Sequence, residues 1–184
     1  MYYQMITVNR KSIAIVWHDA DGKPQIECIY LPGRRDDLLA QISKEFPAVK
    51  QRAQKLPAAV AGQIIKLYDG KEVKFDLSCL HLSRLAEFSA KVLRQTFKIP
   101  RGKVTTYSGL AAQIGSPGAA RAVGTALANN PFPLVIPCHR VVRADGSWGG
   151  FGGGIEMKKE LLAKEGVIFE SSKRVSAAAI CYKA

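Results

Sequence analysis

The stretch from Asn130 to Arg143 reads NPFPLVIPCHRVVR and combines three prolines, a short apolar run and a cysteine directly followed by a histidine. A free thiol has an ordinary pKa of about 8.5, so it is a good nucleophile at neutral pH only where a base or a positive field favours the thiolate. For Cys138 the nearest candidate base is His139. Adjacent residues of a regular strand point to opposite faces, so the two cooperate only if Pro137 starts a bend or a water links them. The alternative is a structural cysteine beside a surface histidine.

Upstream of this stretch, apolar spacing predicts two short helices joined by a tight turn. Tyr107, Leu110, Ala111 and Ile114 form an i, i+3, i+4, i+7 stripe on the first helix. The second is expected at about Gly118–Ala128. Two short helices with a glycine-containing turn between them are typical of a helix-turn-helix.

The outward side of the second helix is expected to be basic and nearly bare, because it carries Gly118, Arg121, Ala122 and Thr125. Small residues allow a helix backbone to approach DNA closely, even in the minor groove, and one long cation can reach between base pairs. The alternative is an ordinary amphipathic helix with a solvated arginine.

Downstream, residues 146–154 read GSWGGFGGG, which fits no nucleotide-binding glycine pattern, so no cofactor is implied. We name this stretch the glycine-rich loop. Its glycines suit either close approach to a ligand, with Trp148 or Phe151 offering apolar surface, or merely a flexible turn.

A helix is predicted at Ile155–Glu165, with Gly166 as its C-terminal cap. Glu165 lies one turn beyond Leu161 and therefore on the inward face, where a carboxylate needs a cation or an imidazole as partner. His139 is such a partner, and the three residues would then form a Cys, His, Glu relay. The alternative is a frayed helix end with Glu165 in water.

The first 80 residues are predicted to form a small α/β domain. Alternating apolar residues indicate strands at Gln4–Val8, Ser12–Trp17, Gln25–Leu31 and Val73–Leu77. Helical spacing indicates one helix that Asp36 caps and Pro47 ends, and another at Ala58–Tyr68. A mainly helical domain is expected at 81–170, followed by a C-terminal tail at 171–184.

Composition favours a folded protein that binds polyanions. The hydrophobic content of 47% is ample for a core, and residues 84–168, with 12 basic and 5 acidic groups, hold +7 of the formal charge of +12. No apolar run approaches about 18 residues, and no signal core follows the N-terminus, so we expect no membrane partner and a cytoplasmic location. The four cysteines form no CxxC pair, which favours reduced thiols.

Four motifs in this order and spacing closely resemble the O6-alkylguanine-DNA alkyltransferases, also called methylated-DNA-protein-cysteine methyltransferases. They are IPRGKVTTY at 99–107, SPGAARAVGTALANNP at 116–131, IPCHRVV at 136–142 and LLAKEG at 161–166. The resemblance covers roughly residues 84 to 168 and implies a ribonuclease H-like sheet with helices in the N-terminal domain. It also implies transfer of the alkyl group of O6-methylguanine irreversibly to Cys138, once per molecule, after the base is flipped out. Whether O4-methylthymine also reacts is left open.

The resemblance implies a role for each matching residue. Cys138 corresponds to the alkyl acceptor, His139 to its water-assisted base, Glu165 to the acid that orients the base, and Asn130 to the brace of the active-site turn. Tyr107 corresponds to the phenol that helps to swing the nucleotide out and protonates the departing guanine.

Further residues are implied in recognition of DNA and base. Arg121 corresponds to the finger that fills the gap in the base stack, on a helix whose DNA-facing side includes Gly118, Ala122 and Thr125. The substrate pocket is expected to be lined by Pro137, Val141, Trp148, Gly149, Phe151 and Gly152. Relatives often carry Tyr and Ser where this chain has Phe151 and Gly152, which puts side-chain hydroxyl contacts to the base in doubt.

No metal or organic cofactor is expected, and the implied partner of this protein, taken as a monomer, is double-stranded DNA with O6-alkylguanine. Some relatives hold structural zinc, but the spacing of His18, Cys28, Cys79 and His81 is not diagnostic. Three rival functions remain: a DNA-binding module without catalysis, a plain helix-turn-helix regulator, and a cysteine hydrolase. The acceptor Cys138 argues against a DNA-binding module without catalysis. The inward Glu165 argues against a plain regulator, and the basic finger Arg121 argues against a cysteine hydrolase.

Overall fold

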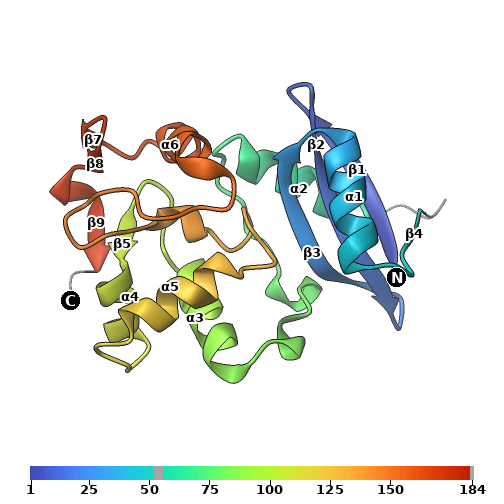
Figure 1. Ribbon diagram of the computed structural model, residues 1–184, viewed down its shortest axis with the longest axis horizontal. Coiled ribbons are helices and arrows are strands. Elements are labelled where there is room, and N and C mark those ends of the chain that lie inside the picture. Colours follow the sequence, from blue (N-terminus) through green and yellow to red (C-terminus); the bar gives the residue numbers. More distant parts are fainter. Residues whose placement is uncertain (52–55, 183–184) are drawn as a thin grey trace.

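The computed structural model describes residues 1–51 and 56–182, which form two lobes packed side by side (Figure 1). The N-terminal lobe holds a four-stranded sheet with the order β3-β2-β1-β4. Its strands are β1 (Tyr2–Val8), β2 (Lys11–Ala20), β3 (Lys23–Gly33) and β4 (Lys50–Gln51). The first three form an antiparallel meander, and β4 lies parallel to β1.

Strand β2 is buried on both faces. Ile13, Ile15 and Trp17 belong to the main core, while the alternate residues Ala14 and Val16 pack on the other face. That second face is covered by α1 (Arg35–Glu45), through Leu38 and Ile42. Successive side chains of a strand point to opposite faces, so both faces of this central strand need a cover.

Two predicted details of this lobe are wrong. Helix α1 begins before Asp36, which lies in its first turn, where a carboxylate stabilises the positive end of the helix without capping it. Val73–Leu77 forms no strand; Phe75 is buried in the core, and a 3-10 turn (η1) follows at Leu77–Cys79. Helix α2 (Ala58–Tyr68) lies where the sequence predicts it.

The second lobe is mainly helical. A 3-10 turn, η2 (Leu82–Arg84), leads into α3 (Glu87–Phe97), and the lobe continues with β5 (Val104–Thr106), α4 (Tyr107–Gln113), α5 (Ala120–Ala128), η3 (Cys138–Arg140), β6 (Val141–Val142) and α6 (Gly154–Lys164). Helix α4 is capped by the Thr106 hydroxyl and ends before Gly115, whose φ of 70° is a left-handed conformation that glycine adopts without strain. Helices α4 and α5 form the helix-turn-helix, and α3 packs against both.

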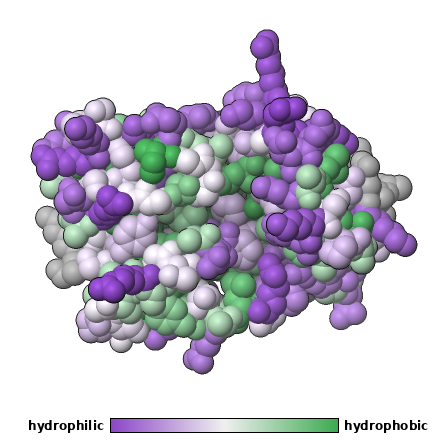
Figure 2. Space-filling view, viewed as in Figure 1, coloured by the Kyte–Doolittle hydropathy of each residue, from purple (hydrophilic) through white to green (hydrophobic). Residues whose placement is uncertain are grey.

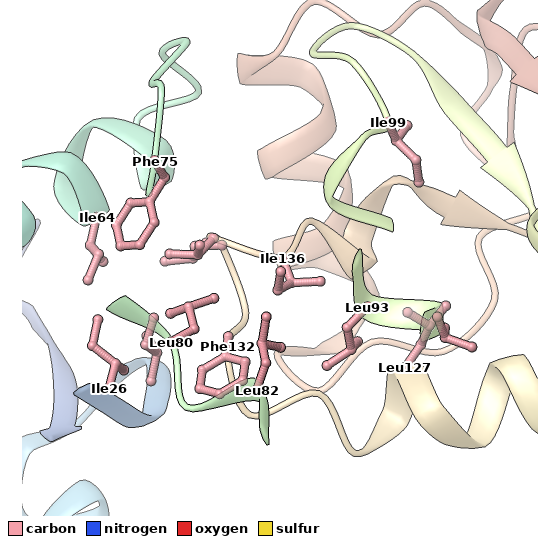
Figure 3. Close-up of a cluster of buried hydrophobic side chains, with 14 of the residues drawn as sticks. Ile26, Ile64, Phe75, Leu80, Leu82, Leu93, Ile99, Leu127, Phe132 and Ile136 are labelled. Carbon is pink, nitrogen blue, oxygen red and sulfur yellow. The ribbon is translucent and has the colours of Figure 1, made fainter. Parts of the chain in front are cut away.

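One core cluster runs through both lobes (Figure 3). Ile26, Ile64 and Phe75 come from the N-terminal lobe, Leu93 and Leu127 from α3 and α5, and the residues between them complete a continuous row. The backbone N–H of Ile29 also donates to the carbonyl of Pro131 at 2.8 Å. The segment that carries Cys138 is therefore anchored on both lobes.

The described residues after α6 include most of the expected C-terminal tail at 171–184. They form β7 (Phe169–Ser171), β8 (Arg174–Val175), a 3-10 turn η4 (Ala177–Ala179) and β9 (Ile180–Tyr182). Strand β9 pairs parallel with β5 in a three-stranded sheet of order β6-β5-β9. No helix in the described part of the chain is long and apolar enough to cross a membrane.

Candidate active site

The reactive turn begins at Pro137, where the backbone bends into η3, so Cys138 and His139 are not neighbours on a regular strand. Cys138 is half-buried and His139 is 1% exposed. Asn130 Nδ2 donates to the Ile136 carbonyl at 3.0 Å and lies 3.3 Å from Cys138 Sγ. The Asn130 amide thus holds the turn and hydrogen-bonds the sulfur.

Behind the turn, His139 and Arg140 both bind Glu165. His139 Nε2 lies 2.9 Å from Glu165 Oε1, and Arg140 makes two hydrogen bonds of 2.8 Å to the same carboxylate. All three side chains are buried, with Glu165 only 3% exposed. Glu165 therefore is the inward, paired carboxylate expected from its helical position, and not a frayed end.

Electrostatics set the tautomer of the imidazole. Burial by itself raises the pKa of the Glu165 carboxyl, but His139 and Arg140 overcome this and lower it to about 2, so Glu165 is a carboxylate and accepts. Burial lowers the pKa of His139, so its ring is neutral with the proton on Nε2. Its Nδ1 has no protein hydrogen-bond partner among the described residues and is left as a proton acceptor.

The thiol needs such help, because burial raises the pKa of Cys138. The side chains that oppose this effect most are Asn130, through its hydrogen bond, and Lys158, through its positive charge; backbone N–H groups of the turn add to them. Lys158 is a residue that our sequence analysis missed. It lies on α6 one turn before Leu161 and Leu162, hence on the same inward face, and this spacing was the available signal.

Lys158 is fully buried, and its Nζ donates to the carbonyls of Val141 at 2.6 Å and Gly150 at 3.5 Å. Burial lowers its pKa to about 8. Because Val141 follows the reactive turn and Gly150 lies in the glycine-rich loop, Lys158 joins these two segments. It also places a positive charge near the sulfur.

We expect Lys158→Met to slow thiol chemistry at position 138. Methionine keeps the shape but removes the cation, so the pKa of Cys138 should rise and its thiolate fraction at neutral pH should fall. The pH dependence of the reaction with iodoacetamide, followed by peptide mass spectrometry, measures this shift. Lys91→Met is the matched control, since Lys91 is exposed on α3; an unshifted profile in Lys158→Met would contradict the role.

A cavity of about 370 Å³ opens at Cys138, within the usual size of small-ligand sites. Its lining consists of Tyr107, Gly124, Leu127, Ala128, Cys138, Gly150, Phe151 and Gly152. Phe151 and Gly152 line it as expected, and Phe151 also packs edge-on against His139. The expected lining residues Pro137, Val141 and Trp148 are instead buried in the protein, and Gly149 lies behind Tyr107. The α5 residues of the lining were not anticipated.

Helix α5 forms one wall of this cavity and also presents an exposed face. Arg121, Ala122 and Thr125 are exposed on it, and Gly118 is exposed just before it. On the opposite side Val123, Ala126 and Leu127 are buried. Figure 2 shows paler and apolar residues in the middle of the molecular face that includes α5, surrounded by hydrophilic side chains. The outward side of α5 thus carries small residues and one long cation. This side lies next to the cavity.

Of the residues considered as metal ligands, His18 and His81 come together, but with Glu27 and not with the cysteines. Both Nδ1 atoms lie 2.8 Å from Glu27 Oε1, and Arg84 Nε lies 3.1 Å from Oε2. Cys28 follows Glu27 on β3 and so packs on the opposite face, with α1. Although the three ligand atoms lie within 4.8 Å of one another, Arg84 already pairs with the carboxylate, which disfavours an added cation. The cluster ties β2 and β3 to the segment before α3.

Solved structures and sequence relatives agree with this architecture. A crystal structure of Mycobacterium tuberculosis OGT in complex with DNA matches 90% of this chain and 93% of its own, with a TM-score of 0.73 and 31% identity. The O6-methylguanine-DNA methyltransferase of Pyrococcus kodakaraensis matches with a TM-score of 0.66 and 30% identity, over 90% of this chain and 99% of its own. A methylated-DNA–protein-cysteine methyltransferase of Methanothermobacter thermautotrophicus is 52% identical over 102 residues, or 55% of this chain and 57% of its own length.

Fold and site together define a helix-turn-helix protein with a cysteine in the lining of a pocket beside its second helix. A family model described as the DNA-binding domain of 6-O-methylguanine DNA methyltransferase matches residues 87–167. The methylated-DNA–protein-cysteine methyltransferase of Pyrobaculum aerophilum is 41% identical over 116 residues, or 58% of this chain and 77% of its own. The chain belongs to the 6-O-methylguanine DNA methyltransferase family, which confirms the resemblance and the mixed α/β fold.

Proposed function

We propose that this protein repairs double-stranded DNA by moving the alkyl group of O6-alkylguanine to Cys138. One observation carries the proposal: Cys138 lines a base-sized cavity with α5 in its wall, and the next residue is an imidazole fixed by Glu165. A plain DNA-binding module has no use for this relay. A cysteine hydrolase has no use for the exposed arginine on α5.

The transfer is a single displacement at carbon. The Cys138 proton passes through a water to His139 Nδ1, which has no direct protein partner among the described residues, and the sulfur attacks the alkyl carbon. The C–O bond breaks, its electrons stay on guanine, and guanine gains a proton. Burial raises the pKa of Tyr107, so its phenol stays protonated and can donate that proton to the departing base.

The product is a thioether, and none of the residues described here offers chemistry to cleave it, so each molecule acts once. In the folded protein Glu165 fixes the imidazole proton on Nε2, Asn130 braces the turn, and Lys158 favours the thiolate. These roles require no cofactor or metal.

The decisive experiment mixes the protein with duplex DNA that contains O6-methylguanine and maps the modified peptide by mass spectrometry. We expect one methyl group per chain, on the peptide that contains Cys138. An unmodified Cys138 together with unrepaired DNA would refute the proposed function. Repeated turnover without a modified peptide would favour a hydrolase.

Access to a base inside a duplex requires extrusion, which costs a few kcal/mol. We propose that α5 lies in the minor groove, with Gly118, Ala122 and Thr125 at the DNA and Arg121 in the place of the flipped nucleotide. The support is the exposure of these residues beside the cavity.

We expect Arg121→Ala to reduce the repair rate of duplex DNA at least tenfold, because loss of about 1.4 kcal/mol in the extruded state has that effect. Reaction with free O6-alkylguanine base, which needs no extrusion, should stay within about twofold of wild type. Single-turnover kinetics on both substrates test this. Arg94→Ala on the exposed side of α3 is the control; equal losses on the two substrates would contradict the finger role.

We further propose that the N-terminal lobe is ribonuclease H-like and that the chain divides near residue 80 into two domains, with the second at 81–170. The sheet order β3-β2-β1-β4, with β4 parallel to β1, supports this description. We also propose that the protein acts as a monomer in a reducing cytoplasm. Its free cysteines Cys28, Cys79 and Cys138 support the reducing location.

A further inference from the structure

The segment from Phe169 to Tyr182, here called the C-terminal segment, lies beyond the residues that the family model matches. It packs against two different parts of the second lobe. One is the strand that leads into Tyr107, and the other is the glycine-rich loop. Tyr107 and this loop both line the cavity at Cys138 and lie against each other.

The first contact is a strand pairing. Strand β9 pairs with β5 through Val104↔Ile180 and Thr105↔Tyr182, and Lys103 Nζ donates to the carbonyl of Ala178 at 3.2 Å. Strand β5 runs directly into α4, whose first residue is Tyr107. The C-terminal segment therefore fixes the strand that delivers this phenol.

The second contact holds the start of the glycine-rich loop. The Val175 N–H donates to the Gly146 carbonyl at 3.0 Å, and Trp148 Nε1 donates to the Ser172 carbonyl at 3.1 Å. The Trp148 ring also packs edge-on against Phe169, with 4.9 Å between ring centroids. The C-terminal segment thereby holds one side of Trp148, while Lys159 of α6 places its Nζ 5.7 Å from the centroid of the indole ring.

These contacts form the second core cluster of the protein. Its buried members are Val104, Val142, Trp148, Leu162, Val167, Val175 and Ala179. Its members come from β5, from β6 directly after the reactive turn, from the glycine-rich loop, from α6 and the residues after it, and from the C-terminal segment. Without its last two members, the cluster would lose one side of its packing.

A shift of Trp148 would be passed to the cavity through the next residue, Gly149. Gly149 touches Tyr107 so closely that a Cβ on it would lie 2.7 Å from the phenol oxygen. The next three residues, Gly150 to Gly152, line the cavity opposite Leu127 and Ala128. Loop and phenol thus keep their spacing only while Trp148 stays in position.

We propose that the C-terminal segment is a positioning element for alkyl transfer: it holds Tyr107 and the glycine-rich loop at the spacing that the flipped base requires. The inference rests on the proposed function. Its physical basis is that a misplacement of about 1 Å in a reacting geometry costs up to about 100-fold in rate.

The first test is a chain that ends at Ile168. At saturating O6-methylguanine duplex, its single-turnover rate should fall about 10-fold to 100-fold. Reaction with the free O6-alkylguanine base should fall by the same factor, because the defect lies in the pocket. The Kd for undamaged duplex should change less than about twofold, because the exposed face of α5 is untouched. A folded truncated protein with the wild-type rate would overturn the inference.

Point variants decide the matter even if the truncated chain does not fold. Val175→Ala removes two methyl groups beside Gly146, and Val8→Ala makes the same change in β1, far from the loop. Both should lower the Tm by a few degrees, but only Val175→Ala should slow transfer several-fold, and Val175→Ile should restore it. Equal slowing in the two alanine variants would mean a merely structural segment.

The intact chain, measured in the same series, separates the two proposals. If the intact, truncated and Val175→Ala proteins all transfer the methyl group at the same rate, the positioning role is overturned and the proposed function stands. Absence of any methyl on Cys138 in the intact chain would overturn the proposed function, and the positioning role with it.

Discussion

Replacement of Cys138 by alanine should abolish alkyl transfer and leave DNA binding intact. The acceptor sulfur is lost, whereas the exposed residues of α5 are unchanged. Cys28 and Cys79 are poor substitutes, because neither belongs to the lining of the cavity and burial raises the pKa of both thiols. We expect a transfer rate below about one thousandth of wild type, at the level of uncatalysed reaction.

Two measurements check this expectation: peptide mass spectrometry after incubation with O6-methylguanine duplex, and an electrophoretic mobility shift with undamaged duplex. Cys79→Ala is the control and should behave as wild type in both. A methylated peptide in the Cys138→Ala protein would mean that another residue is the acceptor. Loss of DNA binding in that variant would mean that the cysteine is mainly structural.

Glu165→Gln should impair both chemistry and stability. A neutral amide no longer fixes the His139 proton on Nε2, so the ring loses its defined acceptor, and transfer should slow about 100-fold or more. The buried Arg140 loses its counterion, and breaking such a buried pair costs about 3–5 kcal/mol in the free energy of unfolding. Urea titration gives the second quantity, and single-turnover transfer on free base gives the first.

The pH dependence of stability follows from the same residues. The pKa of Glu165 is lowered to about 2, so its contribution is complete above the unfolded value near 4.5 and is lost as the pH falls towards 2. His139 acts in the same direction, since burial lowers its pKa and protonation below about 6.5 favours the unfolded chain. Wild type should therefore lose stability on acidification below pH 6.5, and Glu165→Gln should show a shallower loss between pH 4.5 and 2. Equal slopes in that range would contradict the pairing.

Sequence reasoning was most successful where a residue's position was fixed by local periodicity. Glu165 follows Leu161 by one helical turn, which placed it inward, and the adjacent His139 was the natural partner. The same periodicity also places Lys158 inward, yet a lysine is ordinarily solvated, so its burial was not expected. Its acceptors, Val141 and Gly150, belong to segments that only the folded chain brings together.

Contacts between distant segments account for the remaining errors. Trp148 was expected in the pocket, but its partners are Phe169 and Ser172, more than 20 residues away. The alternation in Val73–Leu77 reflects burial of Phe75, and a strand also requires a partner, which alternation cannot supply. The α5 lining of the cavity was missed for the same reason, because it depends on how α5 packs beside Cys138.

The hydrophobic row in Figure 3 couples the unfolding of the two lobes. Ile26 and Ile64 share their packing with Leu93 and Leu127, so neither half keeps an intact interior once the other is lost. Heat or a harmful substitution in the β-meander would disassemble the reaction centre as well, although the described residues that line the cavity come from the second lobe. Loss of repair capacity and loss of the N-terminal fold would then be a single event.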